Sequence, residues 1–227
     1  MATVREVLEE LRSVGDPERL SGMARYGIAT KRALGVSIPE LRALARRLGS
    51  DHELAMGLWD SEIHEARILA SMVDEPERVT QDQMDAWVLE FDSWDLCDQV
   101  CGNLFDRTPY AFLKAVEWSW REEEFVRRAA FALMAASAVH NKSAGDEEFE
   151  VLLPIIRRAA DDDRNYVKKA VNWALRQIGK RSPGLNRKAI ETAKQIQKLD
   201  SRAARWIAAD ALRELTSDPV RKRLANR

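Results

Sequence analysis

The sequence predicts an all-α protein whose helices form antiparallel pairs stacked into an α-solenoid, a curved single domain with a concave face. Almost every segment spaces its apolar residues as an amphipathic helix does, and the alternation typical of strands is absent. The breaks between these segments are short and polar, so no linker divides residues 1–227, which we expect to form one domain. An irregular helical bundle is the alternative.

Capping motifs mark the first helices. Thr3 and Glu6 form a capping box that opens one helix, and Ser37 and Glu40 open a second, which ends at Gly49. The same periodicity predicts helices at residues 52–59, 62–73, 80–90, 94–105, 110–118, 123–139, 147–160, 165–178, 186–198, 202–215 and 219–226. The later helices recur in pairs at about the 40-residue spacing of HEAT-like repeats, which favours the solenoid.

The charges are distributed unevenly along a chain whose net charge is only −1. Residues 1–163 carry −13 and residues 164–227 carry +12. A strongly basic region predicts a surface for a polyanion, and nucleic acid is the leading candidate. Solvated helix faces rich in lysine and arginine are the alternative. The contrast between the two ends also favours a solenoid over a bundle.

Several classes of protein are disfavoured by what the sequence contains. No apolar run approaches the roughly 18 residues of a membrane span, and the N-terminus does not have the pattern of a signal peptide. Cys97 and Cys101 share a helical face, whereas His52, His64 and His140 are scattered, which predicts buried thiols rather than a metal site. No P-loop, dinucleotide fingerprint or zinc-protease motif is present, so we expect no metal, cofactor or nucleotide. We expect a cytoplasmic monomer.

A tryptophan and an aspartate open the helix predicted at residues 94–105. With Ser93 as N-cap, Trp94 and Asp98 lie one turn apart on the same face. A carboxylate held beside an aromatic ring suits the stabilisation of an oxocarbenium-like sugar cation. The alternative is structural: Asp95 complements the helix dipole, Trp94 packs in the core and Asp98 is solvated.

Adjacent arginines lie in the first turns of the helix predicted at residues 123–139. Arg127 and Arg128 point about 100° apart, so one can face solvent while the other follows a packed surface or groove. A guanidinium in such a groove can form a forked contact with a phosphate. An intramolecular salt bridge is the alternative.

Aromatic and basic residues are combined again in the helix predicted at residues 165–178. Trp173 lies outside the apolar stripe of this helix, with Lys169, Arg176 and Lys180 at helical spacings. An indole among cations is common on nucleic-acid surfaces, and a tryptophan that caps the edge of the core is the alternative. Basic residues of the last helices look like sequence-independent phosphate contacts: Arg187, Lys188, Lys194, Lys198, Arg202, Arg205, Arg221, Lys222 and Arg223.

Together these segments resemble the AlkD family of DNA alkylation repair proteins, which are DNA glycosylases built from HEAT-like repeats. The resemblance spans roughly residues 25–185. Its motifs stand in the family's order as Gly35-Val-Ser-Ile-Pro-Glu-Leu-Arg42, Trp94-Asp-Leu-Cys-Asp98, Val126-Arg-Arg128 and Lys169-Ala-Val-Asn-Trp-Ala-Leu-Arg176.

The resemblance implies a monofunctional glycosylase that excises positively charged N3- and N7-alkylated purines from duplex DNA, without a metal or a pocket for a flipped base. It implies that Asp98 stabilises the sugar cation and orients water, that Trp94 and Trp173 press on the deoxyribose and backbone, and that Arg128 holds a phosphate. Further DNA contacts are expected from Arg127, Lys169, Arg176, Lys180 and Arg42. Such a protein is expected to associate with the nucleoid when bound to DNA. A non-catalytic module that binds damaged or branched DNA is one alternative, and a protein-interaction scaffold is another.

Overall fold

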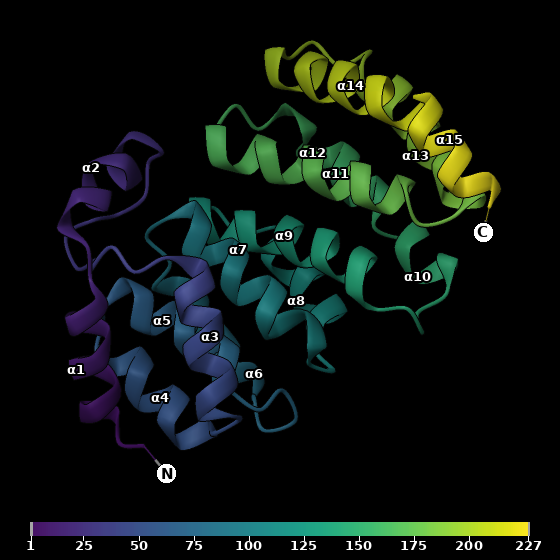
Figure 1. Ribbon diagram of the computed structural model, residues 1–227. Coiled ribbons are helices and arrows are strands. Elements are labelled where there is room, and N and C mark those ends of the chain that lie inside the picture. The colour runs from purple at the N-terminus through teal and green to yellow at the C-terminus, as the bar shows by residue number, and fades with distance from the viewer. Residues whose placement is uncertain (1, 227) are drawn as a thin grey trace. The chain divides into compact units, whose positions relative to one another are not determined.

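The structure, a computed structural model, describes residues 2–226 and consists of helices joined by short loops (Figure 1). No described residue lies in a strand, which confirms the prediction of an all-α protein. The helices form two compact units, and the chain passes from the first to the second between Thr108 and Pro109. That residues 1–227 form one domain therefore stays a prediction.

The first unit is organised around helix α5. Its helices are α1 (Val4–Val14), α2 (Pro17–Arg25), α3 (Ile38–Leu48), α4 (His52–Asp60), α5 (His64–Val73), α6 (Gln81–Leu89) and α7 (Trp94–Asn103), followed by the 3-10 turn η1 (Phe105–Arg107). Helix α5 packs against α3, α4 and α7, and almost all of its residues are buried. Both predicted capping boxes form, at Thr3–Glu6 and at Ser37–Glu40.

Helix α2 is the one helix of the first unit that the apolar periodicity does not predict. Asp16 caps it by accepting a hydrogen bond from the backbone N–H of Glu18, and Pro17 occupies its first turn. No residue of α2 is buried. Its apolar residues Leu20 and Met23 are only half-buried and lie within a single turn, too short a stripe to identify an amphipathic helix in a sequence.

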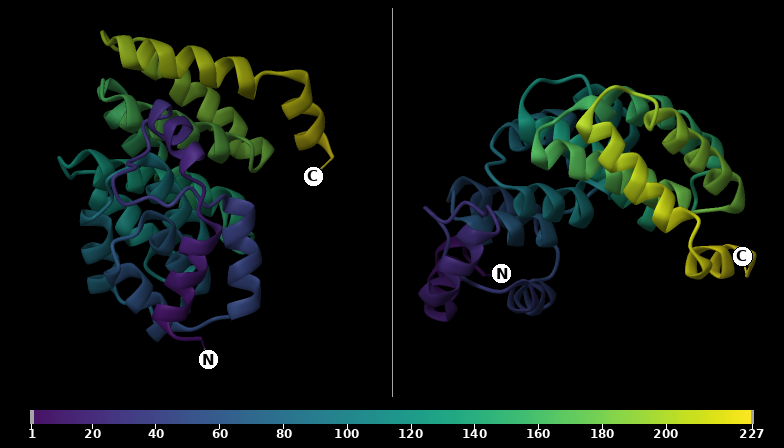
Figure 2. Two further views of the ribbon diagram at one scale, coloured as in Figure 1. Left: turned by 60° about the vertical axis from the view of Figure 1, so that its left-hand side comes forward. Right: turned by 90° about the horizontal axis from the view of Figure 1, so that it is seen from above.

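The second unit is a stack of packed helices. Its elements are α8 (Ala111–Trp118), α9 (Glu124–His140), α10 (Asp146–Glu150), α11 (Leu153–Arg158), the 3-10 turn η2 (Ala159–Asp161), α12 (Asn165–Gly179), α13 (Pro183–Ile196), α14 (Arg202–Leu215) and α15 (Asp218–Ala225). Helix α9 packs against α8 and α12, and α12 packs against α13 and α14. Helices α14 and α15, drawn in yellow, lie at the outer edge of this unit (Figure 2).

The single helix predicted at residues 147–160 is wrong, because the structure divides it into α10, α11 and η2. Helix α10 ends at Glu150, and α11 begins again at Leu153 with Pro154 in its first turn. Proline has no backbone N–H, so Pro154 cannot continue the hydrogen-bond ladder of α10 but fits the start of a new helix.

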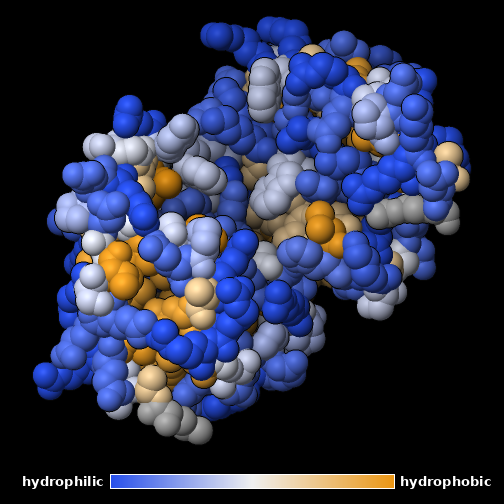
Figure 3. All heavy atoms as spheres, in the orientation of Figure 1, coloured by the Kyte–Doolittle hydropathy of each residue, from blue (hydrophilic) through white to orange (hydrophobic). Residues whose placement is uncertain are grey.

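Apolar side chains are gathered in the cores of the two units. Cys97 and Cys101 are free and buried on α7, as predicted. The surface seen in Figure 3 is largely hydrophilic, with an apolar patch (orange) between α1 and α3 of the first unit. None of the helices in residues 2–226 has the length and apolar character needed to cross a bilayer.

Candidate nucleic-acid interface

The start of α7 is fixed by a buried hydrogen-bonded pair. Ser93 is the N-cap residue, but its hydroxyl donates to Asp95 Oδ1 at 2.8 Å instead of accepting a backbone N–H. Asp95 Oδ2 lies 2.9 Å from Nε2 of buried His64 on α5. Burial opposes the charge on both groups. Their hydrogen bond and mutual attraction nevertheless lower the pKa of Asp95 and raise the pKa of His64.

Trp94 and Asp98 occupy successive turns of α7, as their spacing predicts. Both residues are half-buried, so neither of them is sealed in the core. The indole N–H of Trp94 donates to the backbone carbonyl of Tyr26, at the end of α2, over 2.8 Å. This bond fixes the ring beside the turn that carries Asp98. The side chain of Tyr26 itself is 75% exposed.

Arg42 lines a cleft of about 350 Å³ within the first unit. Arg46, one turn further along α3, and Arg107 of η1 lie in the same cleft, together with Asn103 at the end of α7. All three arginines are exposed, and none forms an ion pair within residues 2–226. The cleft therefore presents three positive charges at the end of the helix that carries Asp98.

On α9 the two adjacent arginines face different partners. Arg128 is only 5% exposed, and its Nη1 donates to the backbone carbonyl of Tyr166 at 2.6 Å. Arg127 Nε lies 3.4 Å from the carboxylate of Asp162. Arg128 thus holds the first turn of α12 against α9, in addition to any contact with a phosphate. The contact with DNA stays a prediction for both residues.

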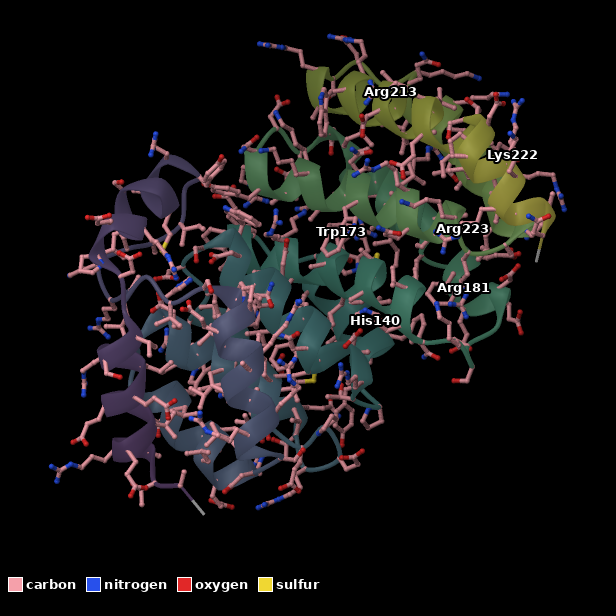
Figure 4. All side chains as sticks on the ribbon, viewed as in Figure 1. His140, Trp173, Arg181, Arg213, Lys222 and Arg223 are labelled. Atoms are coloured by element: carbon pink, nitrogen blue, oxygen red, sulfur yellow. The ribbon has the colours of Figure 1, made fainter. Side chains whose placement is uncertain are left out.

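Helix α12 carries Trp173, which is half-buried and lies where α12 runs beside α9 (Figure 4). Lys169, one turn earlier, is exposed. Arg176 and Lys180, in contrast, both pair with Glu214 of α14, at 2.6 and 2.5 Å. Burial opposes the charge of Glu214, but Lys180 and Arg176 hold its pKa below the ordinary value.

The structure therefore brings the predicted residues together in two groups. Trp94, Asp98 and Arg42 belong to the first unit, and the remaining predicted residues belong to the second: Arg127, Arg128, Lys169, Trp173, Arg176 and Lys180. Arg46 and Arg107 were not predicted. Arg46 carries a signal in the sequence, since it follows Arg42 by one turn. Arg107 carries none, because only the fold brings η1 to α3.

Within residues 2–226, histidine, cysteine and acidic side chains form no group of three or more that could hold a metal ion. The candidate residues instead offer a carboxylate, two indoles and several guanidinium and ammonium groups, which can contact a sugar, a base or a phosphate.

A sequence profile of the DNA alkylation repair enzymes matches residues 7–215. The chain belongs to this family.

Two relatives of this chain come from Listeria. The uncharacterized protein Lin0241 of Listeria innocua is 24% identical over 203 residues, and Lmo0209 of Listeria monocytogenes is 22% identical over the same length. In both cases the match covers 88% of each chain.

A solved structure shares the fold with a TM-score of 0.79 at 18% identity, covering 98% of this chain and 96% of the other. It represents a family related to the HEAT-like repeat DNA glycosylases, with affinity for branched DNA structures. The similarity confirms the prediction, made from the pairing of the helices, that this chain has a HEAT-like repeat fold.

Proposed function

We propose that this DNA alkylation repair protein is a monofunctional glycosylase that releases positively charged N3- and N7-alkylated purines from duplex DNA. The pair of Trp94 and Asp98 on α7 carries the proposal. The two side chains share a helical face, and each stays accessible enough to meet a ligand. Membership of the family and the related fold support a role in the repair of alkylated DNA.

The reaction needs little machinery, because an alkylated purine that carries a positive charge is already a good leaving group. The C1′–N bond breaks with its electron pair on the purine, which leaves neutral, and positive charge develops on the deoxyribose. The carboxylate of Asp98 stabilises that charge electrostatically. Water then forms the new C1′–O bond and gives up a proton, which leaves an abasic site.

In this proposal the residues outside α7 position the DNA. Lys169 on α12 and Arg42 of the cleft are exposed cations that can contact phosphates of the backbone. Trp173 is a second indole for contact with the deoxyribose chain. Arg176 and Lys180 are already paired with Glu214, so their net attraction for a phosphate is reduced. We therefore assign them a smaller share of the binding.

The test is release of the base from a duplex that contains 7-methylguanine, followed by chromatography and by alkaline cleavage at abasic sites. We expect the wild type to release the base. We expect Asp98→Asn to be slower by about a hundredfold, the scale of losing one electrostatic stabiliser of a transition state. Asp60→Asn removes one exposed carboxylate from the same unit and is the matched control, expected to react like the wild type.

A non-catalytic protein that binds branched DNA is the second candidate, because the related solved structure comes from a family with that affinity. The two candidates differ in the same assay. If the protein binds a four-way junction more tightly than a duplex of equal length and releases no base, it is a non-catalytic protein that binds branched DNA. Equal release by the wild type and Asp98→Asn would exclude the proposed role of Asp98.

A further inference from the structure

Trp206, on the second turn of α14, is a large aromatic side chain outside the core of the second unit. Other residues of α14 form the buried apolar stripe: Ala203, Ala204, Ile207, Ala208, Ala211 and Leu215. Trp206 lies beside that stripe and is 43% exposed. Single exposed apolar residues are common on protein surfaces. Whether the ring of Trp206 belongs to a binding site therefore depends on the side chains around it.

One lysine lies at the indole of Trp206, and two arginines precede Trp206 on α14. The Nζ atom of Lys168 on α12 lies 5.9 Å from the centroid of the ring, within the range of a cation–π interaction. Arg202 precedes Trp206 by one helical turn, is exposed, and forms no ion pair within the described part of the chain. Arg205 pairs with Asp200 at 3.3 Å, but both side chains are largely exposed, so solvent weakens the pair.

The nearby carboxylate on the same helix is already engaged. Asp210 accepts a hydrogen bond from the side-chain amide of Asn172 at 2.7 Å and also pairs with Arg213. Figure 4 places Arg213 on the outer helix α14. Ala209 follows Trp206 by three residues, is exposed, and adds only a methyl group beside the ring. The surface at Trp206 is therefore exposed and aromatic and carries Lys168 and Arg202, while Asp161 of η2 and Asp200 line a pocket at the start of α14.

We propose that Trp206, Lys168 and Arg202 form a binding site for unpaired nucleotides of single-stranded DNA. In a duplex the faces of each base are covered by its neighbours, so an indole face stacks readily only on an unpaired base. The ammonium group of Lys168 near the ring and the guanidinium group of Arg202 one turn before it suit the phosphates that flank such a base. This charge complementarity favours DNA over an apolar protein partner.

The site goes beyond the proposed function, which needs only a paired duplex with a damaged base. With this site the second unit binds paired DNA through the residues of α12 and unpaired DNA through α14. It therefore has higher affinity where the two kinds of DNA adjoin, at gaps, single-stranded tails and branch points. The added affinity for such DNA then depends on Trp206.

Fluorescence anisotropy with a labelled oligothymidylate of about twelve nucleotides, and with a duplex of equal length, tests the site. We expect Trp206→Ala to weaken binding of the single strand by about tenfold, because one stacked base is lost. Trp206→Phe retains an aromatic face and is expected to keep most of the affinity. Neither substitution is expected to change the affinity for the duplex or the rate of base release from it.

Trp120 provides a matched control in the same unit. It is 65% exposed and has an arginine over its ring, with Arg158 Cζ at 3.3 Å from the centroid. Arg121 follows it but pairs with Glu123, and Glu122 and Glu124 are also acidic, so we expect Trp120→Ala to bind the single strand like the wild type. Asp98→Asn is also expected to bind it normally, so a failure of the glycosylase proposal is distinguished from a failure of this site.

Three results would overturn the proposal. One is wild-type affinity of Trp206→Ala for the single strand. Another is an equal loss of affinity for single strand and duplex, which would make Trp206 part of a general surface. The third is a loss in Trp120→Ala as large as that in Trp206→Ala.

Discussion

At the scale of single residues, helical spacing in the sequence predicts which side chains share a face but not what holds them there. Trp94 and Asp98 share one face of α7, as their separation predicts. Their supports come from distant parts of the chain: the carbonyl that accepts from Trp94 is 68 residues away, and His64 is 31 residues from Asp95. Contacts across such separations depend on the fold and leave no local pattern.

The pair of His64 and Asp95 predicts a dependence of stability on pH. The pKa of His64 is raised, so its contribution is complete below the ordinary histidine value of about 6.5 and is lost as pH rises through the raised value. The pKa of Asp95 is lowered, so its contribution is complete above about 4 and is lost as pH falls through the lowered value. The pair therefore stabilises the fold most between these limits.

We expect His64→Gln to lower the free energy of unfolding by about 3 kcal/mol near pH 6, because it removes the charged partner of a carboxylate that is only 15% exposed. Urea denaturation of both proteins at a series of pH values from 6 to 9 measures the difference. The difference is expected to shrink as pH rises and His64 loses its proton. A difference that stays constant over this range would show that the charge on His64 does not contribute.

At the scale of elements, most helix positions follow from apolar periodicity and capping, and the exceptions have local causes. Helix α2 has no buried face, and Pro154 restarts a helix that the pattern predicts as continuous. Gly35, in the loop before α3, has φ +81°. Its N–H and that of Leu34 both donate to the buried carboxylate of Glu65, at 2.7 and 2.8 Å, which fixes this loop to α5.

Substitution by alanine at two glycines with positive φ is expected to lower the free energy of unfolding by different amounts. A Cβ at Gly35 would lie 2.1 Å from the carbonyl oxygen of Asp16, whereas a Cβ at Gly49, φ +76°, would meet nothing within 4 Å. Both changes to alanine strain the backbone, at about 1 to 2 kcal/mol. We expect Gly35→Ala to lower the free energy of unfolding by at least about 3 kcal/mol, because the collision adds to this strain. Equal losses in the two variants, measured by urea denaturation, would contradict the expectation.

At the scale of the whole molecule, the division of charge can be read from the sequence, but the number of charges available to a ligand cannot. Residues 164–227 carry +12, yet Arg176, Lys180 and Arg213 are paired with carboxylates of α14. Other basic residues of this region are exposed and form no ion pair within residues 2–226: Lys169, Arg187, Lys194, Lys198, Arg202, Arg221, Lys222 and Arg223. The packing of α12 on α14 reveals that Arg176 and Lys180 are paired with Glu214, whereas Arg213 pairs with Asp210 within α14.

If the carboxylate of Asp98 stabilises positive charge on the deoxyribose, the protein should also bind cationic analogues of the reaction intermediate more tightly than neutral ones. We compare a duplex with a pyrrolidine nucleotide, which places a positive charge at the anomeric position, and one with a neutral tetrahydrofuran nucleotide. The wild type is expected to prefer the cationic analogue by about a hundredfold or more, and Asp98→Asn is expected to lose this preference. Equal binding of the two duplexes by the wild type, or an undiminished preference in Asp98→Asn, would contradict the claim.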